Sequence, residues 1–279
     1  MISVIITTYN HPEWLEKVLW GFAVQTFDDF ELVIADDGSG PETATLIENF
    51  RTATGLDVQH VWHEDDGFRK CEILNKAILA ARGDYLVFTD GDCIPRRDFL
   101  ALHHSLAEPG RFLSGGYIKL PLETSKAISI DDVVAGRATD YHHLRGLGAP
   151  ASRRLARLAL GTRAARLLDR ITPTRPTWNG HNASAWRRDI IAANGFDERM
   201  GYGGLDRELG ERLENAGIRG KQIRHRAVVV HLDHGRGYRN PEILRKNAEI
   251  RRETRRTGRT RAVVGLDRHL HGQTTSRPG

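Results

Sequence analysis

Cysteine is scarce in this sequence: Cys71 and Cys93 are the only two among 279 residues. Two thiols cannot complete a thiolate metal site, and so low a count fits a reducing compartment better than a disulfide-stabilised secreted fold. No apolar run reaches the roughly 18 residues that a membrane-spanning helix needs. The sequence also starts without a basic segment followed by an apolar one, so no secretory signal is expected. Together these absences predict a cytoplasmic protein.

Two common nucleotide-binding motifs are missing as well. No Gly-x-Gly-x-x-Gly follows the first apolar run, residues 2–8, which argues against a dinucleotide cofactor. The sequence also has no Gly-x-x-x-x-Gly-Lys-Ser/Thr loop, which is the phosphate-binding loop of many nucleotide hydrolases.

Acidic residues are rare in one segment of an otherwise mildly basic chain. The net charge is +5, and residues 153–175 contain seven arginines and one aspartate. Such a stripe attracts polyanions, among them nucleic acid, anionic lipid and charged glycans. It is also typical of a solvated helix face, and the sequence leaves both interpretations open.

The first half of the chain shows a regular alternation of strand and helix signals. The strand-like runs are residues 2–8, 30–35, 58–62 and 85–89. Segments whose apolar residues recur at helical spacing lie between them. This alternation predicts an α/β fold with a mostly parallel sheet, in which ligands bind beyond the carboxyl ends of the strands. Polar clusters fall at three of those ends, at residues 7–10, 36–39 and 90–92.

The pattern divides the chain into four parts. Residues 1–120 form an α/β half, which ends in a strand-like run at 112–120 that is interrupted by two glycines. Residues 121–177 are predicted to be a helical insertion with helices at 130–144 and 152–171. Sheet-like chemistry resumes over residues 178–240. Residues 241–279 hold a basic C-terminal helix, which ends near Arg256, and a tail with little pattern.

The most informative motif is Asp90-Gly91-Asp92, directly after the buried run 85–89. Two carboxylates one residue apart at a strand end have no apolar cover and are destabilising unless a positive group lies between them. A divalent cation is the natural partner, and an anionic ligand such as a nucleotide diphosphate can bind to that cation. The same three residues also make a good turn.

Several motifs together carry a resemblance to a known family. They are residues 3–10 (SVIITTYN), 25–39 (QTFDDFELVIADDGS), 83–93 (GDYLVFTDGDC), 182–188 (NASAWRR), 194–198 (NGFDE) and 201–213 (GYGGLDRELGERL). The chain resembles the inverting family 2 glycosyltransferases of the GT-A fold over roughly residues 1–118 and 178–234. Its second half is also similar to the C-terminal segment of galactosyltransferase-type enzymes.

The resemblance implies roles for the matching positions. On the donor side it assigns contacts to the nucleotide sugar to Thr7, Tyr9, Asp37, Arg69, Asp90 and Gly91. It implies that Asp92 coordinates a Mn²⁺ or Mg²⁺ ion and that His231 completes the metal site. Asp206 aligns with the general base. The parts 1–120 and 178–240 then become the nucleotide-sugar-binding half and the acceptor and catalytic half.

Acceptor contacts are expected from Trp178, Asn182, Tyr202 and Gly204. The match departs from the family at Leu205, where many relatives carry a glutamate that contacts the acceptor. Simpler interpretations stay open for several residues: Asp206 as a helix cap, Trp178 as a packing residue, and His231 or His234 as an ordinary surface histidine.

The implied activity is metal-dependent transfer of a sugar, with inversion, from a nucleotide diphosphate donor to a hydroxyl of a glycan or glycolipid in cell-envelope polysaccharide synthesis. The nucleotide is expected to be UDP. An Arg-rich amphipathic helix at 152–171 suits contact with anionic lipid at the inner face of the membrane. The alternatives are a nucleotidyltransferase and a non-catalytic relative that binds nucleic acid or glycan. No nucleic-acid reader motif is present, so nucleic acid is not an expected partner.

Overall fold

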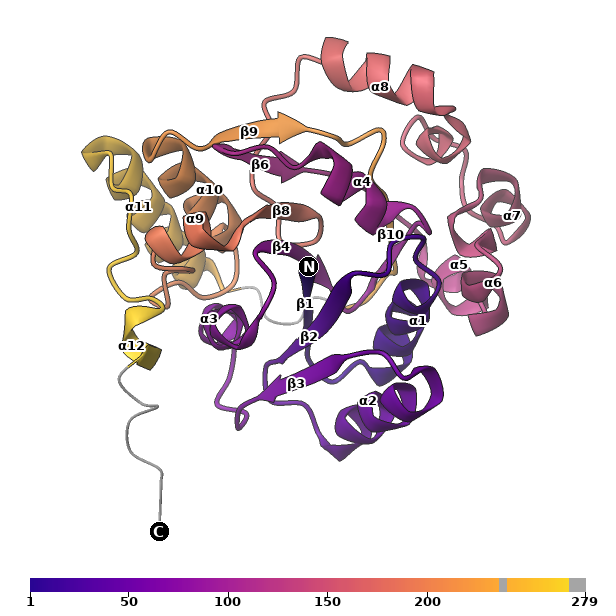
Figure 1. Ribbon diagram of the computed structural model, residues 1–279, viewed down its shortest axis with the longest axis horizontal. Helices are drawn as coiled ribbons and strands as arrows, with labels where there is room; N and C mark the ends of the chain where they lie inside the picture. The colour runs from indigo at the N-terminus through magenta and orange to yellow at the C-terminus, as the bar shows by residue number, and fades with distance from the viewer. Residues whose placement is uncertain (236–239, 271–279) are drawn as a thin grey trace.

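The computed structural model describes residues 1–235 and 240–270, so the end of the predicted tail lies outside the described residues (Figure 1). Two sheets organise these residues. A seven-stranded sheet has the order β3-β2-β1-β4-β8-β6-β9, and a three-stranded sheet has the order β5-β10-β7. The strands are β1 (Ile2–Thr8), β2 (Phe30–Asp36), β3 (Val58–Trp62), β4 (Tyr85–Asp90), β5 (Cys93–Pro95), β6 (Arg111–Ser114), β7 (Gly116–Lys119), β8 (Ala183–Trp186), β9 (Arg219–Gln222) and β10 (Val228–His231).

The first half of the large sheet is parallel, as the alternating pattern predicts. Strands β3, β2, β1 and β4 pair in that order. They are connected by α1 (Pro12–Ala23), α2 (Pro41–Thr54) and α3 (Lys70–Ala80). The register sets Thr7 level with Asp90, and Thr8 level with Asp36. The polar clusters after three strands therefore meet at one edge of the sheet.

Helices cover both faces of this sheet, which explains why its strands are almost continuously apolar. Along β1, Val4 and Ile6 pack with residues of α1 and α2, whereas Ile5 packs on the other face with residues of α3. All three side chains have no exposed surface. The mixed α/β fold with a mostly parallel sheet flanked by helices confirms the predicted fold class.

The strand-like run at 112–120 divides at its two glycines, as expected, and its two parts belong to different sheets. β6 belongs to the large sheet and β7 to the small one. The chain crosses between the sheets at Gly115 and Gly116, where other chain segments approach closely. A Cβ at Gly115 would lie 2.0 Å from the Asn182 side chain, and one at Gly116 would lie 2.2 Å from the carbonyl oxygen of Arg224. Only glycine fits this crossing without displacing its neighbours.

The segment between β7 and β8 is helical, but its helices are shorter than predicted. The 130–144 helix is wrong, since the chain instead forms α6 (Ile130–Val134), a 3₁₀ turn (Arg137–Thr139) and α7 (Tyr141–Gly146). Gly136 has a φ of 79° and ends the first piece. The 152–171 helix is also wrong. It consists of a 3₁₀ helix (Leu155–Ala159) and α8 (Thr162–Ile171), which are separated at residues 160 and 161.

Three short helices and one long one lie elsewhere in the described chain. They are α4 (Phe99–Leu106), α5 (Leu122–Ala127), α9 (Arg187–Ala192) and α11 (Pro241–Thr257). The sequence predicts α11 closely, and Pro241 and the αL residue Gly258 bound it. A further turn, α12 (Asp267–Leu270), lies in the segment that the sequence treats as a patternless tail. Within the described residues, no helix combines the length and apolar character that crossing a bilayer requires.

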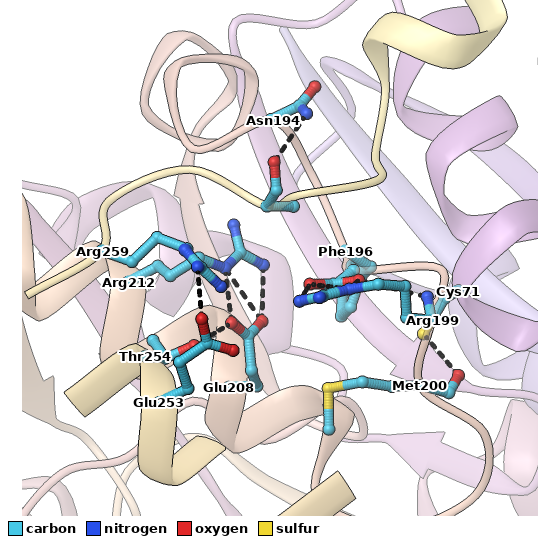
Figure 2. A network of polar contacts seen from close by, with 12 residues as sticks. Cys71, Asn194, Phe196, Arg199, Met200, Glu208, Arg212, Glu253, Thr254 and Arg259 are labelled. Atoms are coloured by element: carbon cyan, nitrogen blue, oxygen red, sulfur yellow. Dashed lines mark hydrogen bonds and ion pairs between the residues drawn. The ribbon is translucent and has the colours of Figure 1, made fainter. Parts of the chain in front are cut away.

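A buried ion pair joins α10 (Leu205–Asn215) to the elements around it (Figure 2). The Arg212 side chain has no exposed surface, and its Nε lies 2.9 Å from both carboxylate oxygens of Glu208. Thr254 on α11 donates to Glu208 at 3.0 Å. The other guanidinium nitrogens donate to the carbonyl oxygens of Ala193 and Gly195. The pair therefore ties α10 to α11 and to the loop after α9.

Replacing Arg212 with methionine is expected to lower the free energy of unfolding by about 3–5 kcal/mol, because the Glu208 carboxylate would stay buried without a cation. The double variant Glu208→Leu/Arg212→Met should recover most of that loss. Urea unfolding followed by circular dichroism measures both effects.

The exposed pair Arg175–Glu214 provides the control, since the Arg175 side chain is 78% exposed. Arg175→Met should change the unfolding free energy by less than about 1 kcal/mol. If Arg212→Met were as mild as Arg175→Met, the buried pair would not have the stabilising role described.

Candidate active site

Thr7, Asp90 and Gly91 meet where β1 and β4 end. The Thr7 hydroxyl donates to Asp90 Oδ1 at 2.6 Å, and the backbone N–H of Gly91 donates to the Thr7 carbonyl at 2.7 Å. A Cβ at Gly91 would lie 3.0 Å from that carbonyl oxygen, so a larger residue would be tight there. These contacts fix the first carboxylate of the Asp-Gly-Asp motif at the edge of the sheet.

Asp37 lies in a second cluster at the end of β2. Its Oδ1 is 2.7 Å from Nε2 of His63, and its Oδ2 accepts the backbone N–H of Arg69 at 3.1 Å. Burial raises the pKa of Asp37 above its ordinary value, although His63 opposes this. The Tyr9 hydroxyl donates to Asp65 at 2.9 Å, and its ring is 44% exposed. Asp37 therefore orders the start of α3, and Tyr9 offers an exposed aromatic face beside it.

The Arg69 side chain turns toward its own loop. It contacts the carbonyl of Glu64 and lies 3.5 Å from Glu72. In this arrangement its guanidinium has no contact with Asp90 or Asp92 among the described residues. Its nucleotide contact therefore stays a prediction.

Lys70 is a functional candidate that the sequence analysis missed. Its ammonium lies 2.7 Å from Asp90 Oδ1. Burial favours the neutral amine, but the charges of Asp90 and Asp206 outweigh burial and raise the pKa of Lys70. Burial also disfavours the Asp90 carboxylate, yet the Lys70 charge and hydrogen bond hold the pKa of Asp90 well below its usual range. The sequence held one hint of this role. Lys70, the first residue of α3, directly follows Arg69, which the resemblance assigns to the nucleotide sugar.

Asp206 is the second residue of α10 and faces the same region. It follows Gly204, which has a φ of 86° and allows the sharp turn into the helix. Asp206 Oδ1 is buried and has no hydrogen-bond partner among the described residues. Burial raises its pKa to about 6, and the negative charge of Asp90 adds to this while Lys70 opposes it. A carboxylate with such a pKa suits general-base chemistry near neutral pH.

A possible metal site lies on the other side of the Asp-Gly-Asp motif. Ligand atoms of Asp92, His231 and His234 all lie within 4.8 Å of one another. Asp92 Oδ2 is 2.9 Å from Nε2 of His234 and 3.7 Å from Nε2 of His231. The sequence prediction preferred His231 over His234, and the structure brings both histidines to Asp92. The missed signal was their spacing, since His231 and His234 are three residues apart and directly follow β10.

The two histidines present the nitrogens that a metal would need. His231 Nδ1 lies 2.7 Å from the carbonyl of Leu232, and His234 Nδ1 lies 2.8 Å from the carbonyl of Gly235. A carbonyl can only accept, so each Nδ1 carries a proton. Each Nε2 faces Asp92, to which it can donate, and it would ligate a metal ion only after losing that proton. Two imidazoles and a carboxylate, oriented by backbone carbonyls, fit Mn²⁺ chemically and also accept Mg²⁺ less favourably.

His181 is a further half-buried group that the sequence analysis did not single out. Burial lowers its pKa to about 4, and although Asp90 opposes this shift, the ring stays neutral at neutral pH. It packs edge-on against Tyr117, with ring centroids 4.5 Å apart. His181 therefore adds a neutral wall to the site rather than another positive charge.

The four predicted acceptor residues divide into two groups. Trp178 is 1% exposed and packs against Phe88, and Asn182 is fully buried, where it donates to the carbonyls of Gly116 and Ala227. Both side chains are buried in the protein interior, which argues against contact between either of them and an acceptor.

Tyr202 and Gly204 lie in the glycine loop before α10, and both are partly exposed. Asn247 on α11 holds this loop by donating to the carbonyls of Gly201, Tyr202 and Gly203. Leu205 is 5% exposed and packs in the core with Leu209. It offers no polar group to an acceptor.

Comparison with solved structures finds similar folds. The mannosyltransferase PcManGT from Pyrobaculum calidifontis, solved with GDP-Man and Mn²⁺, superposes with a TM-score of 0.58 at 20% identity over 99% of this chain and 65% of its own. Staphylococcus aureus TarS residues 1–349, solved with UDP-GlcNAc, superpose with a TM-score of 0.56 at 17% identity over 89% of this chain and 66% of that one. Likenesses at such low identity establish the fold, which is that of the GT-A glycosyltransferases.

Sequence comparison finds similarity to one family. The family described as glycosyl transferase family 2 matches residues 3–112. The validoxylamine A glucosyltransferase of Streptomyces hygroscopicus subsp. jinggangensis is 29% identical over 229 residues, which cover 78% of this chain and 52% of that relative. The chain is therefore similar to glycosyl transferase family 2 over its N-terminal residues. It spans about half the length of this curated relative.

Metal binding should depend on the three clustered residues. We expect Asp92→Asn and His234→Ala each to weaken Mn²⁺ binding by at least about tenfold. The first removes the negative charge of a ligand and the second removes a ligand nitrogen, and either loss should matter more than the loss of a residue that only hydrogen-bonds to a ligand. Isothermal titration calorimetry with MnCl₂ measures the effect.

Asp233→Asn is the matched control, since Asp233 lies between the two histidines in sequence but pairs with Lys119 at 2.7 Å. It should bind Mn²⁺ as the wild type does. Equal losses in all three variants would mean that the turn, rather than the ligand set, had been disturbed.

Proposed function

We propose that this protein transfers a sugar from a nucleotide diphosphate, UDP being the proposed nucleotide, to a hydroxyl of a glycan or glycolipid, with inversion at the anomeric carbon. The observation that carries the proposal is the Asp206 carboxylate. Its Oδ1 is buried and unpartnered, its pKa is raised to about 6, and Asp90 and Lys70 are near enough to influence it. Support also comes from relatives and neighbours, which include a UDP-GlcNAc complex and a GDP-Man complex.

Residues of this chain would have distinct roles in proton transfer and in donor binding. Asp206 would accept the proton of the acceptor hydroxyl as that oxygen attacks the anomeric carbon. General-base catalysis of this kind raises the reaction rate by roughly 10²–10⁴-fold. Lys70 would keep Asp90 ionised and would place a positive charge where the donor binds. Tyr9 would offer its exposed ring to the base. A single displacement of this kind inverts the sugar and needs no nucleophile from the protein.

A divalent ion would be held by Asp92, His231 and His234 and would neutralise the charge that develops on the leaving diphosphate. The three ligand atoms and the locked Nδ1 protons support this assignment. Mn²⁺ is the proposed ion because two of the three ligands are imidazoles.

The rate of transfer should follow the titration of Asp206. The base acts only when ionised, so kcat/KM is expected to fall tenfold per pH unit below about pH 6 and to level off above it. Measuring nucleoside diphosphate release between pH 4.5 and 8 with Mn²⁺ and a panel of UDP- and GDP-sugars gives this profile.

Asp206→Asn should reduce transfer by about 10²–10⁴-fold without weakening the fold at pH 8. Burial raises the pKa of this carboxyl above the ordinary 3.8, so its ionisation opposes folding. That penalty is absent below pH 3.8 and complete above about pH 6. An Asn variant that keeps full turnover would remove Asp206 as the base.

We also propose that α8 contacts anionic lipid, which would bring a lipid-linked acceptor near the enzyme. Arg163, Arg166, Leu167, Arg170 and Ile171 recur at helical spacing on its exposed side. Leu167 is 57% and Ile171 62% exposed. The helix lies at the outer rim of the molecule (Figure 1).

The opposite side of α8 is fixed to the fold. Asp169 is buried and accepts from the backbone N–H of His225 at 2.8 Å and from Arg226 Nε at 2.7 Å. The helix is therefore held with its cationic and apolar side outward, a combination suited to a negatively charged bilayer surface.

Replacing Arg163, Arg166 and Arg170 with alanine should lower partitioning onto phosphatidylglycerol vesicles on the order of a hundredfold, since each basic residue near such a surface contributes about 1 kcal/mol. Vesicle sedimentation at 50 mM and 500 mM NaCl measures the loss and its salt dependence. Leu167→Asp should act in the same direction, whereas Val263→Asp, which changes a 50% exposed residue elsewhere, should not. Wild-type protein that stays in the supernatant would end the proposal.

A further inference from the structure

Three arginines lie close together where the helical insertion meets the loop between β9 and β10. Arg154 directly precedes the 3₁₀ helix Leu155–Ala159, and Arg157 lies within it. Arg224 belongs to the loop. Burial lowers the pKa of Arg157, and the charges of Arg224 and Arg154 lower it further. Like charges this close disfavour one another unless an anion lies among them.

The carboxylate beside this cluster is already engaged by other donors. Asp169 on α8 is the acidic group whose charge opposes the shift of the arginine. Its Oδ1 accepts the backbone N–H of His225 at 2.8 Å and lies 3.0 Å from the Nδ1 atom of that residue, and its Oδ2 accepts from Arg226 Nε at 2.7 Å. Within residues 1–235 and 240–270, none of the three clustered arginines forms an ion pair. The cluster therefore carries positive charge that the protein does not neutralise.

The guanidinium groups of Arg157 and Arg224 can be reached from solvent. Both side chains are partly buried, and Arg224 Nε is a buried atom without a hydrogen-bond partner. The terminal nitrogens of Arg224 and all three guanidinium nitrogens of Arg157 also make no hydrogen bond to the described residues, yet they are not among the buried atoms. These nitrogens are therefore accessible, and two guanidinium forks are open to an external anion.

Tyr117 on β7 connects the arginines to the proposed active site. Its ring lies 4.5 Å from the ring of His181 and 6.1 Å from the ring of His231. On its other side it is one of the groups whose charge acts on Arg157. The backbone of Arg224 packs against the start of β7. Tyr117 therefore separates the arginines from the histidines of the site.

The number of positive charges favours a phosphate over a carboxylate. A guanidinium fork can donate two parallel hydrogen bonds to either group. A phosphate monoester carries about 1.5 to 2 negative charges and three free oxygens, so one phosphate can bind two forks. A carboxylate has a single charge and would leave most of the cluster unneutralised.

We propose that Arg157 and Arg224 bind a phosphoryl group of the acceptor, which is then a phosphorylated glycan or a sugar that is linked to lipid through phosphate. The inference rests on the proposed transferase function, because that function supplies the acceptor. The diphosphate of the donor is assigned to the other side of Tyr117, where the proposed metal site lies. A second phosphate site on the insertion side therefore belongs to the acceptor.

The two sources of the phosphate differ in their relation to α8. Asp169 of this helix binds the two residues that follow Arg224, so α8 and the arginine loop are held together. A phosphate that is linked to lipid would reach the arginines from the membrane surface that α8 is proposed to contact. A phosphorylated glycan would reach them from solution.

Arg157→Gln and Arg224→Gln test the site, because each removes one fork and keeps a polar side chain. The soluble probes are glucose 1-phosphate and glucose 6-phosphate, with glucose as the uncharged comparison. Saturation-transfer NMR with UDP and Mg²⁺ present measures their affinities while the donor site is occupied. At least one sugar phosphate should bind the wild type more tightly than glucose, and each variant should weaken it by about tenfold or more. Both variants should unfold at the wild-type temperature, since neither arginine has an ion-pair partner among the described residues.

Vesicle sedimentation distinguishes the two sources. The vesicles are phosphatidylcholine with either a polyprenyl phosphate or an equal amount of phosphatidylglycerol. If the phosphate is linked to lipid, Arg157→Gln should lower binding to the polyprenyl phosphate vesicles and leave binding to the phosphatidylglycerol vesicles nearly unchanged. If it belongs to a soluble glycan, Arg157→Gln should change only the affinity for the sugar phosphates.

The matched controls are Arg245→Gln and Arg252→Gln on α11, which remove the same charge from exposed residues. They should leave the binding of both kinds of probe unchanged. A wild type that binds UDP but neither sugar phosphate nor polyprenyl phosphate overturns the subsite alone. An Arg157→Gln variant that loses UDP affinity assigns the arginines to the donor and also overturns it. A wild type that ignores UDP overturns the proposed function itself.

Discussion

One ammonium group among carboxylates sets the electrostatics of the proposed site. Lys70 contacts Asp90 directly, and the charges of Asp206 and Asp92 also reach it. Without that cation, the acidic residues at this edge of the sheet would repel one another and resist ionisation. With it, Asp90 stays ionised while burial keeps the pKa of Asp206 near 6. Two neighbouring carboxylates thus acquire different protonation behaviour from their surroundings, as acid–base sites require.

The sequence predicted the parallel half of the fold well, because its information is local. Continuous apolar runs located β1 to β4 within one residue of their observed ends. The convergence of polar strand ends followed from the topology of parallel sheets. The insertion was harder to predict, since glycine breaks in 130–171 interrupt otherwise helical spacing.

Residues that act through long-range contacts could not be predicted from pattern alone. Lys70 is an ordinary lysine at a helix start until the fold places it against Asp90, 20 residues later. His234 looks like a surface histidine until the segment after β10 brings it to Asp92. The same limit affected Trp178 and Asn182, whose polar and aromatic character suggested sugar contacts. Only the packed structure shows that both lie in the interior.

Gly180 carries a consequence for how relatives of this protein diverge. A Cβ at this position would lie 2.5 Å from Asp206 Oδ1, so any side chain would push the carboxylate from its place. Such a change would leave the sheet, the metal ligands and every family motif in the sequence intact. A relative could therefore lose the position of its general base through one substitution outside those motifs. Position 180 should be inspected as carefully as the acidic pair when relatives are compared.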